Sequence, residues 1–82
     1  MSDTKSRLIE VIGRYVTDPG ELEAVGRGEP FLTATSLDSL TMMTVIIEIE
    51  KRFSMRFDLE TIEHTFETLE TVVTYLDRRG AQ

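Results

Sequence analysis

The sequence predicts an all-α fold: a small four-helix bundle with three main helices and one short helix, and a long loop between the first two. Three observations lead to this prediction. Apolar residues recur at intervals of three and four in segments 8–16, 40–53 and 68–79. The segment 40–53 contains neither Gly nor Pro. Apolar residues make up 40% of the chain and charged residues 29%, which is typical of a soluble globular domain.

Length and residue usage limit what the chain can be. With 82 residues there is room for one core, so we expect a single domain over 1–82, with its core at about 4–79. We also expect a monomer. The sequence contains no Cys, which excludes disulfides, thiolate metal sites and a cysteine nucleophile.

The charge balance argues against two classes of partner. The chain has 9 Lys and Arg residues against 15 Asp and Glu residues, a formal net charge of −6. This charge repels nucleic-acid phosphates and anionic lipid surfaces. The first residues lack the apolar run of a signal peptide, and no apolar run is long enough to span a membrane. We therefore expect a cytoplasmic protein without nucleic acid or membrane insertion.

The first main helix is expected at 8–16, where the apolar side chains form one stripe. Pro19 ends it, because proline disfavours the helical conformation of the residue before it and has no amide hydrogen. Residues 21–36 show no sustained period and predict the long loop. Four apolar residues are expected to hold this loop against the helices: Leu22, Val25, Phe31 and Leu32.

The segment 40–53 is the strongest helical signal. Its β-branched residues would also suit a strand, but the length and spacing of the run favour a helix. Residues 54–57 are expected to form a connector, and 58–63 a short helical turn capped by Asp58. The last helix is expected at 68–79, with Arg78 and Arg79 near its carboxyl end and Gly80 as its stop.

The helix expected at 40–53 carries apolar residues on two faces. One stripe is wide enough to face the core and contains Met42, Val45, Ile46, Ile49 and Phe53. Leu40, Met43 and Ile47 form a second stripe on the opposite face. Either the loop at 21–36 folds over the second stripe, or the stripe stays exposed as a docking surface for a partner.

A serine stands where this helix is expected to begin. Asp38 is a favoured N-cap residue, because its carboxylate can accept hydrogen bonds from the amides of the first turn. Ser39 would then lie outside the core, near the positive end of the helix dipole. A phosphate attached through its hydroxyl is electrostatically favoured there. By itself, this pattern also fits an ordinary capped helix start.

The residues around Ser39 resemble a known family. The run Leu-Asp-Ser-Leu at 37–40, followed by Glu-Ile-Glu-Lys-Arg-Phe at 48–53, is similar to the attachment motif and second helix of acyl carrier proteins. The similarity continues through Phe57 to a last helix introduced by Thr68 and ending near Tyr75, and covers about residues 31–76.

The resemblance implies a four-helix fold in which Ser39 carries a 4′-phosphopantetheine arm and Asp38 belongs to the attachment motif. A phosphopantetheinyl transferase would attach the arm from coenzyme A. Acyl-loading and acyl-processing enzymes would then act on groups held on it as thioesters. The chain is thus expected to be a free-standing acyl carrier protein, and not an enzyme, in a specialised lipid or polyketide-type pathway.

The sequence departs from the family pattern at four positions. Thr35 and Ser36 stand where an apolar residue and Gly are usual, and Thr41 and Thr44 stand where fatty-acid carriers have acids. We therefore expect partner enzymes to dock mainly on three apolar residues, with weaker electrostatic steering from two acids: Leu40, Met43 and Ile47, then Asp38 and Glu48.

Two alternatives stay open. One is a peptidyl or aminoacyl carrier protein of a nonribosomal or amino-acid-activating system, although Asp38 directly before the serine favours acyl carriers. The other is a helical adaptor that keeps the fold, carries no arm and binds partners through the second stripe alone.

No catalytic or metal-binding residue is predicted. His64 is the only histidine and has no second ligand at useful spacing, so we expect it at the surface. Glu48 and Glu50 diverge around a helix and therefore cannot form a paired-carboxylate acid and base.

Overall fold

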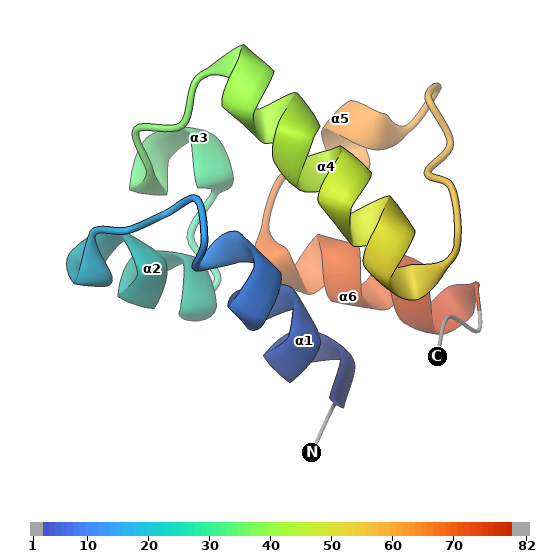
Figure 1. Ribbon diagram of the computed structural model, residues 1–82, viewed down its shortest axis with the longest axis horizontal. Coiled ribbons are helices and arrows are strands. Elements are labelled where there is room, and N and C mark those ends of the chain that lie inside the picture. Colours follow the sequence, from blue (N-terminus) through green and yellow to red (C-terminus); the bar gives the residue numbers. More distant parts are fainter. Residues whose placement is uncertain (1–2, 80–82) are drawn as a thin grey trace.

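The computed structural model describes residues 3–79, and these residues form six helices (Figure 1). The helices are α1 (Asp3–Ile12), α2 (Pro19–Gly26), α3 (Phe31–Ala34), α4 (Ser39–Phe53), α5 (Ile62–Thr65) and α6 (Leu69–Arg78). No strand occurs between residues 3 and 79, so the predicted all-α class is confirmed.

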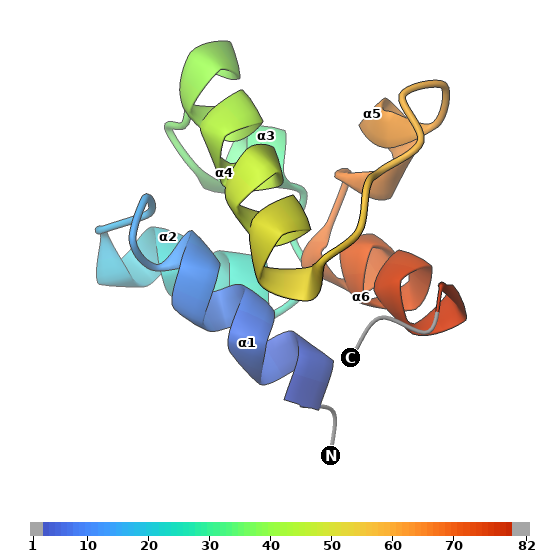
Figure 2. The same cartoon turned by 45° about the vertical axis from the view of Figure 1, so that its right-hand side comes forward.

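The helices α1, α4 and α6 surround the core. α1 packs against both α4 and α6, whereas α2 lies against α3 and α5 against α6 (Figures 1 and 2). The buried cluster contains Leu8, Val11, Ile12, Val16, Val25, Phe31, Val45, Ile46, Ile49, Phe53, Phe57, Phe66, Leu69, Val72 and Leu76. Because α4 supplies four of these side chains, the core fixes its rotation about its own axis.

Two of the three main helices lie where the sequence predicts them. α4 begins at Ser39 instead of residue 40, and α6 is capped by Thr68 and Arg79. The prediction for the first helix is wrong at both ends, because α1 spans Asp3–Ile12 and not 8–16. After Ile12 the Arg14 and Tyr15 amides bond to carbonyls three residues back, so this segment is a tight turn. Gly80, the predicted stop of the last helix, lies outside the described residues.

The prediction of a long loop at 21–36 is wrong, because this part of the chain contains α2 and α3. Pro19 does not end the preceding helix, contrary to the sequence prediction, because α1 already ends at Ile12. It occupies the first position of α2, where its missing amide hydrogen removes no intrahelical bond. Asp18 is the N-cap, and its carboxylate accepts a hydrogen bond from the Gly20 amide at 2.8 Å. Pro30 likewise stands directly before α3.

Leu32 behaves differently from the other apolar residues of this segment. Val25 and Phe31 are buried and Leu22 is partly buried, as predicted. Leu32, which was expected to pin the segment to the helices, is 87% exposed. It lies on α3, a single turn that buries Phe31 and therefore directs the following side chain to another side.

The short helix is also displaced from its predicted position. α5 spans Ile62–Thr65 and not 58–63. Asp58 does not cap it, because the Asp58 carboxylate accepts a hydrogen bond from the Glu60 amide at 3.0 Å in the turn before α5. Thr61 stands at the N-cap position and makes no side-chain capping bond.

The carboxyl end of α4 is fastened to α1. Arg7 Nη2 donates a hydrogen bond to the carbonyl of Arg52 at 2.9 Å, and the Arg7 guanidinium lies 4.2 Å from the centroid of the Phe53 ring. Ser54 follows with a positive φ of 52° and ends the helix in the left-handed conformation. These contacts hold α4 at the end that is farthest from Ser39.

Candidate functional site at the start of α4

The first turn of α4 is organised by Asp38. This residue has an extended backbone, with ψ at 176°, and its carboxylate Oδ1 accepts a hydrogen bond from the Thr41 amide at 2.8 Å. Its carbonyl accepts the first helical bond, from the Met42 amide at 2.9 Å. Asp38 is therefore the N-cap that the sequence predicts, and Ser39 becomes the first residue of the helix.

The charge of Asp38 is stabilised by the same contact. Its pKa lies below the usual value of a carboxyl group because the carboxylate accepts the hydrogen bond from the Thr41 amide. The side chain is exposed to solvent. Asp38 is thus an ionised group directly beside Ser39 at neutral pH.

Ser39 is exposed, and the hydroxyls near it differ in their surroundings. Ser36 is also exposed, but it precedes the helix, and its amide donates a hydrogen bond to Glu21 Oε1 at 3.3 Å. Thr35 Oγ1 donates to the carbonyl of Phe31 at 2.8 Å and accepts from the Leu37 amide at 3.3 Å. The hydroxyl of Thr35 therefore connects the backbone of α3 to the backbone at Leu37, two residues before Ser39.

A groove of about 770 Å³ opens beside Ser39. Its walls come from α3, residues 35–39, α4 and α5, and Figure 2 shows α4 and α5 on opposite sides of this region. The lining residues grade from buried to exposed. Phe31, Ile46 and Phe66 are buried; Thr35, Leu37, Met42 and Ile62 are partly buried; Leu32, Asp38, Ser39, Met43 and Glu63 are exposed. The groove therefore has an apolar inner end and a rim that includes Ser39.

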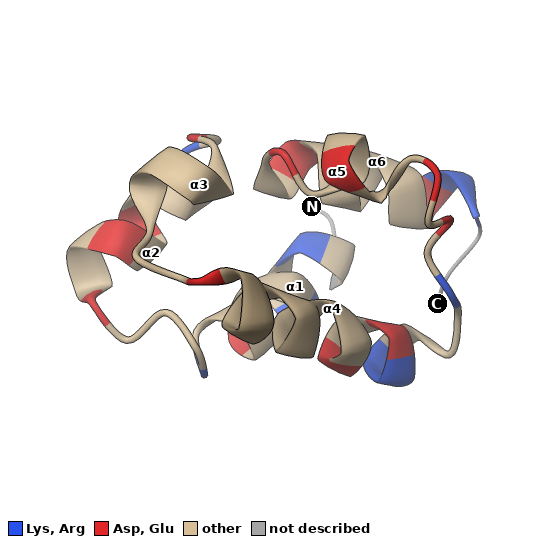
Figure 3. Cartoon of the chain, turned by 90° about the horizontal axis from the view of Figure 1, so that it is seen from above, with Lys and Arg blue, Asp and Glu red and all other residues tan. Residues whose placement is uncertain are grey.

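The second apolar stripe of α4 lies at the surface. Leu40 is 80% exposed, Met43 48% and Ile47 49%, so neither α2 nor α3 covers the stripe. On the opposite face Val45, Ile46, Ile49 and Phe53 are buried and Met42 is partly buried. Figure 3 shows that the first turns of α4 carry no charged residue, whereas acidic and basic residues gather toward its carboxyl end.

The two acids of α4 are engaged within the protein. Glu48 Oε2 lies 3.5 Å from Arg52 Nε and 3.9 Å from Arg14 Nη1. Glu50 Oε2 accepts a hydrogen bond from the Phe57 amide at 2.9 Å. The two carboxylates thus diverge around the helix, as predicted, and contact different partners. Glu48 forms ion pairs with two arginines.

Other chemistry-bearing residues do not assemble into a site. No group of three or more His, Cys, Asp or Glu side chains between residues 3 and 79 is placed to hold a metal ion. His64 is exposed, as predicted, beside a more open depression of about 440 Å³ along α5 and α6. Over the described part of the chain, no helix combines the length and the apolar character needed to cross a membrane.

Sequence reasoning missed most of the groove. It identified Ser39, Asp38 and Met43 as site residues, but it assigned the wall formed by α3 to a loop and gave no role to Ile62 and Phe66. The only available signal was the presence of large apolar residues in segments without helical periodicity. Such a signal shows that a side chain is buried, and it does not show what it is buried against.

Comparison with known families identifies a carrier domain. The family model described as "Phosphopantetheine attachment site" matches residues 6–76, which include all of α2 to α5 and most of α1 and α6. No curated protein and no solved structure matches the chain.

Proposed function

Because the chain belongs to the phosphopantetheine attachment site family, we propose that it is an acyl carrier protein whose arm is attached to Ser39. Proteins of this family carry a 4′-phosphopantetheine group and act as carriers, not as catalysts. When bound, this group supplies the thiol that holds the cargo as a thioester. The residues of the chain have three tasks: to hold the group, to shelter the cargo and to present both to partner enzymes.

Ser39 is suited to the first task. It is exposed, so a transferase can reach its hydroxyl. It opens α4, where the first amides of a helix lack intrahelical partners and favour a negatively charged phosphate. A phosphopantetheinyl transferase would replace the hydroxyl proton of Ser39 with the phosphopantetheinyl group of coenzyme A. The adenosine bisphosphate part of coenzyme A is then the leaving group.

The groove is the observation that favours an acyl cargo. Its inner end is lined by Phe31, Ile46 and Phe66, and its mouth includes Ser39. Burial of an alkyl chain there gains about 0.8 kcal/mol for each CH₂ group removed from water. An aminoacyl cargo would bring an ammonium group instead, and burial of an unpaired charge in an apolar site is unfavourable. The peptidyl or aminoacyl carrier is therefore the second candidate.

Partner enzymes are proposed to dock on Leu40, Met43 and Ile47. These side chains form an exposed apolar stripe that starts directly beside Ser39, and a partner that covers them would face the arm. Electrostatic steering by Glu48 is expected to be weak, because Arg14 and Arg52 already lie near its carboxylate. A docking face with so little acidic charge favours dedicated partners of a specialised lipid or polyketide-type pathway.

One mass measurement tests the attachment site. The protein is incubated with coenzyme A, Mg²⁺ and a broad-specificity phosphopantetheinyl transferase, and the intact mass is compared for the wild type, Ser39→Ala and Ser36→Ala. We expect the phosphopantetheinyl mass on the wild type and on Ser36→Ala only. An unmodified wild type would favour the helical adaptor, and a modified Ser39→Ala would place the site elsewhere.

A second measurement tests the cargo. The same transferase can attach butanoyl, octanoyl or dodecanoyl arms from the acyl-coenzyme A forms, and an aminoacyl arm as a comparison. If the groove holds alkyl chains, at least one acyl arm should raise the melting temperature above that of the arm with a free thiol. The aminoacyl arm should not. A larger rise with the aminoacyl arm would favour the second candidate.

A further inference from the structure

Four aromatic rings form a row from α6 to the inner end of the groove. The centroids of Tyr75 and Phe57 are 5.2 Å apart, those of Phe57 and Phe66 are 4.8 Å apart, and those of Phe66 and Phe31 are 6.4 Å apart. Phe66 and Phe31 line the groove, whereas Phe57 and Tyr75 do not. Phe57 meets Phe66 edge to face, with an interplanar angle of 74°.

The position of Phe57 is fixed from two helices. Its amide donates a hydrogen bond to Glu50 Oε2 of α4 at 2.9 Å. The next amide, of Asp58, donates to the hydroxyl of Tyr75 on α6 at 3.0 Å. The side chain of Phe57 is itself buried. The backbone at Phe57 is therefore held to α4 and α6, and its buried ring packs between the rings of Phe66 and Tyr75.

The backbone next to Phe66 is fixed as well. Thr71 Oγ1 donates a hydrogen bond to the carbonyl of Thr65 at 2.7 Å, and the Phe31 amide donates to the carbonyl of Glu67 at 3.0 Å. With the backbone held on both sides of Phe66, the freedom left to this ring is rotation of its side chain. The Phe57 ring occupies space into which Phe66 would otherwise turn.

We infer that Phe57, held in place by Tyr75, is a positioning residue that limits how deep the groove is and hence which acyl chain lengths fit. The inference rests on the proposed acyl cargo. A smaller side chain at position 57 leaves space behind Phe66, because packed interiors relax only partly around a deletion. The Phe66 ring can then turn away from the groove, and the inner end of the groove becomes longer.

The experiment is a chain-length profile of the arm-loaded protein. Wild type and Phe57→Leu are loaded with butanoyl, hexanoyl, octanoyl, decanoyl and dodecanoyl arms, and the melting temperature of each form is compared with that of the free-thiol form. We expect the largest rise to move to the next longer arm, or beyond, in Phe57→Leu. A merely destabilised protein would show lower melting temperatures with the same preferred arm.

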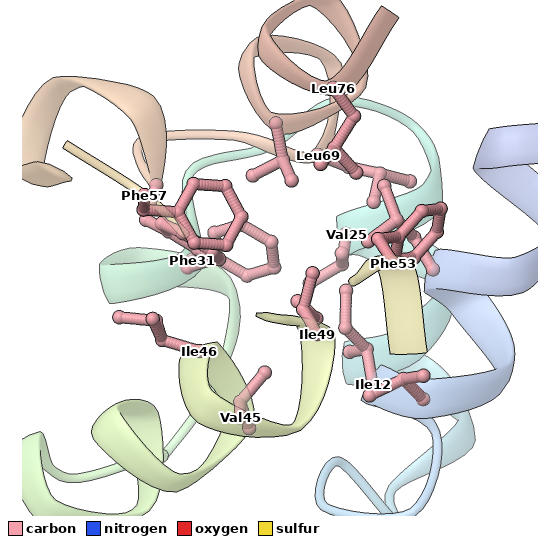
Figure 4. Close-up of a cluster of buried hydrophobic side chains, with 14 of the residues drawn as sticks. Ile12, Val25, Phe31, Val45, Ile46, Ile49, Phe53, Phe57, Leu69 and Leu76 are labelled. Carbon is pink, nitrogen blue, oxygen red and sulfur yellow. The ribbon is translucent and has the colours of Figure 1, made fainter. Parts of the chain in front are cut away.

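Phe53→Leu is the matched control. Phe53 is also a buried phenylalanine, but it packs under the Arg7 guanidinium and lies outside the aromatic row. Figure 4 shows Phe53 on the side of the core opposite Phe57 and Phe31. We expect Phe53→Leu to lower the melting temperatures of all forms and to keep the wild-type chain-length preference.

Tyr75→Phe tests the tether with a smaller change. It keeps a ring against Phe57 and removes only the hydroxyl that accepts the Asp58 amide. We expect a shift toward longer arms that is smaller than in Phe57→Leu. Tyr15→Phe, at a partly buried tyrosine outside the aromatic row, should leave the profile unchanged. An unchanged preference in both Phe57→Leu and Tyr75→Phe, or in Tyr75→Phe alone where Phe57→Leu does not fold, overturns the inference. A wild type that no arm stabilises overturns the proposed acyl cargo, and the inference with it.

Discussion

The two ends of α4 are held in opposite ways. At the carboxyl end, Arg7 bonds to the Arg52 carbonyl and covers Phe53, and Glu48 lies between two arginines. At the amino end, Asp38 provides a local cap, and the stripe that begins at Leu40 is exposed. The helix is therefore fastened at one end and accessible at the other.

Because of this difference, the contacts that stabilise α4 and the surface that presents Ser39 to partners lie at opposite ends of the helix. The contacts that fix α4 are made far from Ser39, so partners can approach the serine without disturbing them. The groove also opens at the less fastened end, between α4 and the short helices α3 and α5. Segments that bind ligands are commonly those with few stabilising contacts, because they must open to admit a ligand. If the two ends act separately, substitutions at the carboxyl end of α4 should change stability, and substitutions at its amino end should change how Ser39 is recognised.

The largest expected effect compares two isoleucines that are two residues apart. Ile49 is fully buried, whereas Ile47 is 49% exposed. Ile49→Ala should lower the free energy of unfolding by about 2–5 kcal/mol, because it leaves a cavity in the core. Ile47→Ala should change it by no more than about 0.5 kcal/mol. Urea denaturation measures both, and equal losses would mean that the two faces of α4 do not differ as described.

The next effect concerns the fastened end. Arg7→Met keeps much of the apolar contact with Phe53 but removes the charged donor to the Arg52 carbonyl. We expect a loss of about 1.5–3 kcal/mol in the free energy of unfolding, the usual range for a hydrogen bond from a charged group. Arg56→Met, at an exposed position after the end of α4, is the control and should have little effect. Attachment of the arm to folded Arg7→Met should proceed as in the wild type.

The sequence places α4 and α6 closely, but it shifts α1 by several residues and misplaces the shorter helices. The segment 40–53 has both a regular period and a strong cap, so its helix follows from local chemistry. The exposure of Leu40, Met43 and Ile47 did not follow, because it depends on where other segments lie. The same pattern would fit a stripe covered by α2 and α3.

The errors at α2 and α3 have a common physical cause. A proline can either end a helix or stand at the start of one, and the sequence alone does not tell which applies at Pro19 and Pro30; in the structure both stand at the start of a helix. Helices as short as α3 and α5 show no measurable period, so tertiary contacts decide that they form. The groove could not be predicted for the same reason, because two of its walls are made by these short helices.

A smaller effect is expected from the pH dependence of the cap. The pKa of Asp38 is lowered in the folded protein by the hydrogen bond from the Thr41 amide. Its contribution to stability is therefore complete above the unfolded pKa, about 3.9, and is lost as the pH falls through the lower folded pKa. Asp38→Asn can still cap the helix but does not titrate at this position. The stability difference between wild type and Asp38→Asn should thus shrink in this acidic range, as followed by melting temperature. A constant difference would contradict the assigned role of the carboxylate.

The smallest effect on stability is expected from two substitutions in the exposed stripe of α4, which should instead change how a transferase recognises the protein. Leu40→Ala and Met43→Ala remove exposed side chains, so each should change the free energy of unfolding by no more than about 0.5 kcal/mol. If partners cover these residues, both substitutions should lower the kcat/KM of the transferase for Ser39. Thr74→Ala, an exposed position on α6, is the control for a general surface effect. A transferase that modifies all four proteins equally would limit recognition to the serine and its cap, and the stripe would then need another explanation. Reduced modification without loss of stability would instead place the docking face at the accessible end of α4, which is the end that the core leaves free.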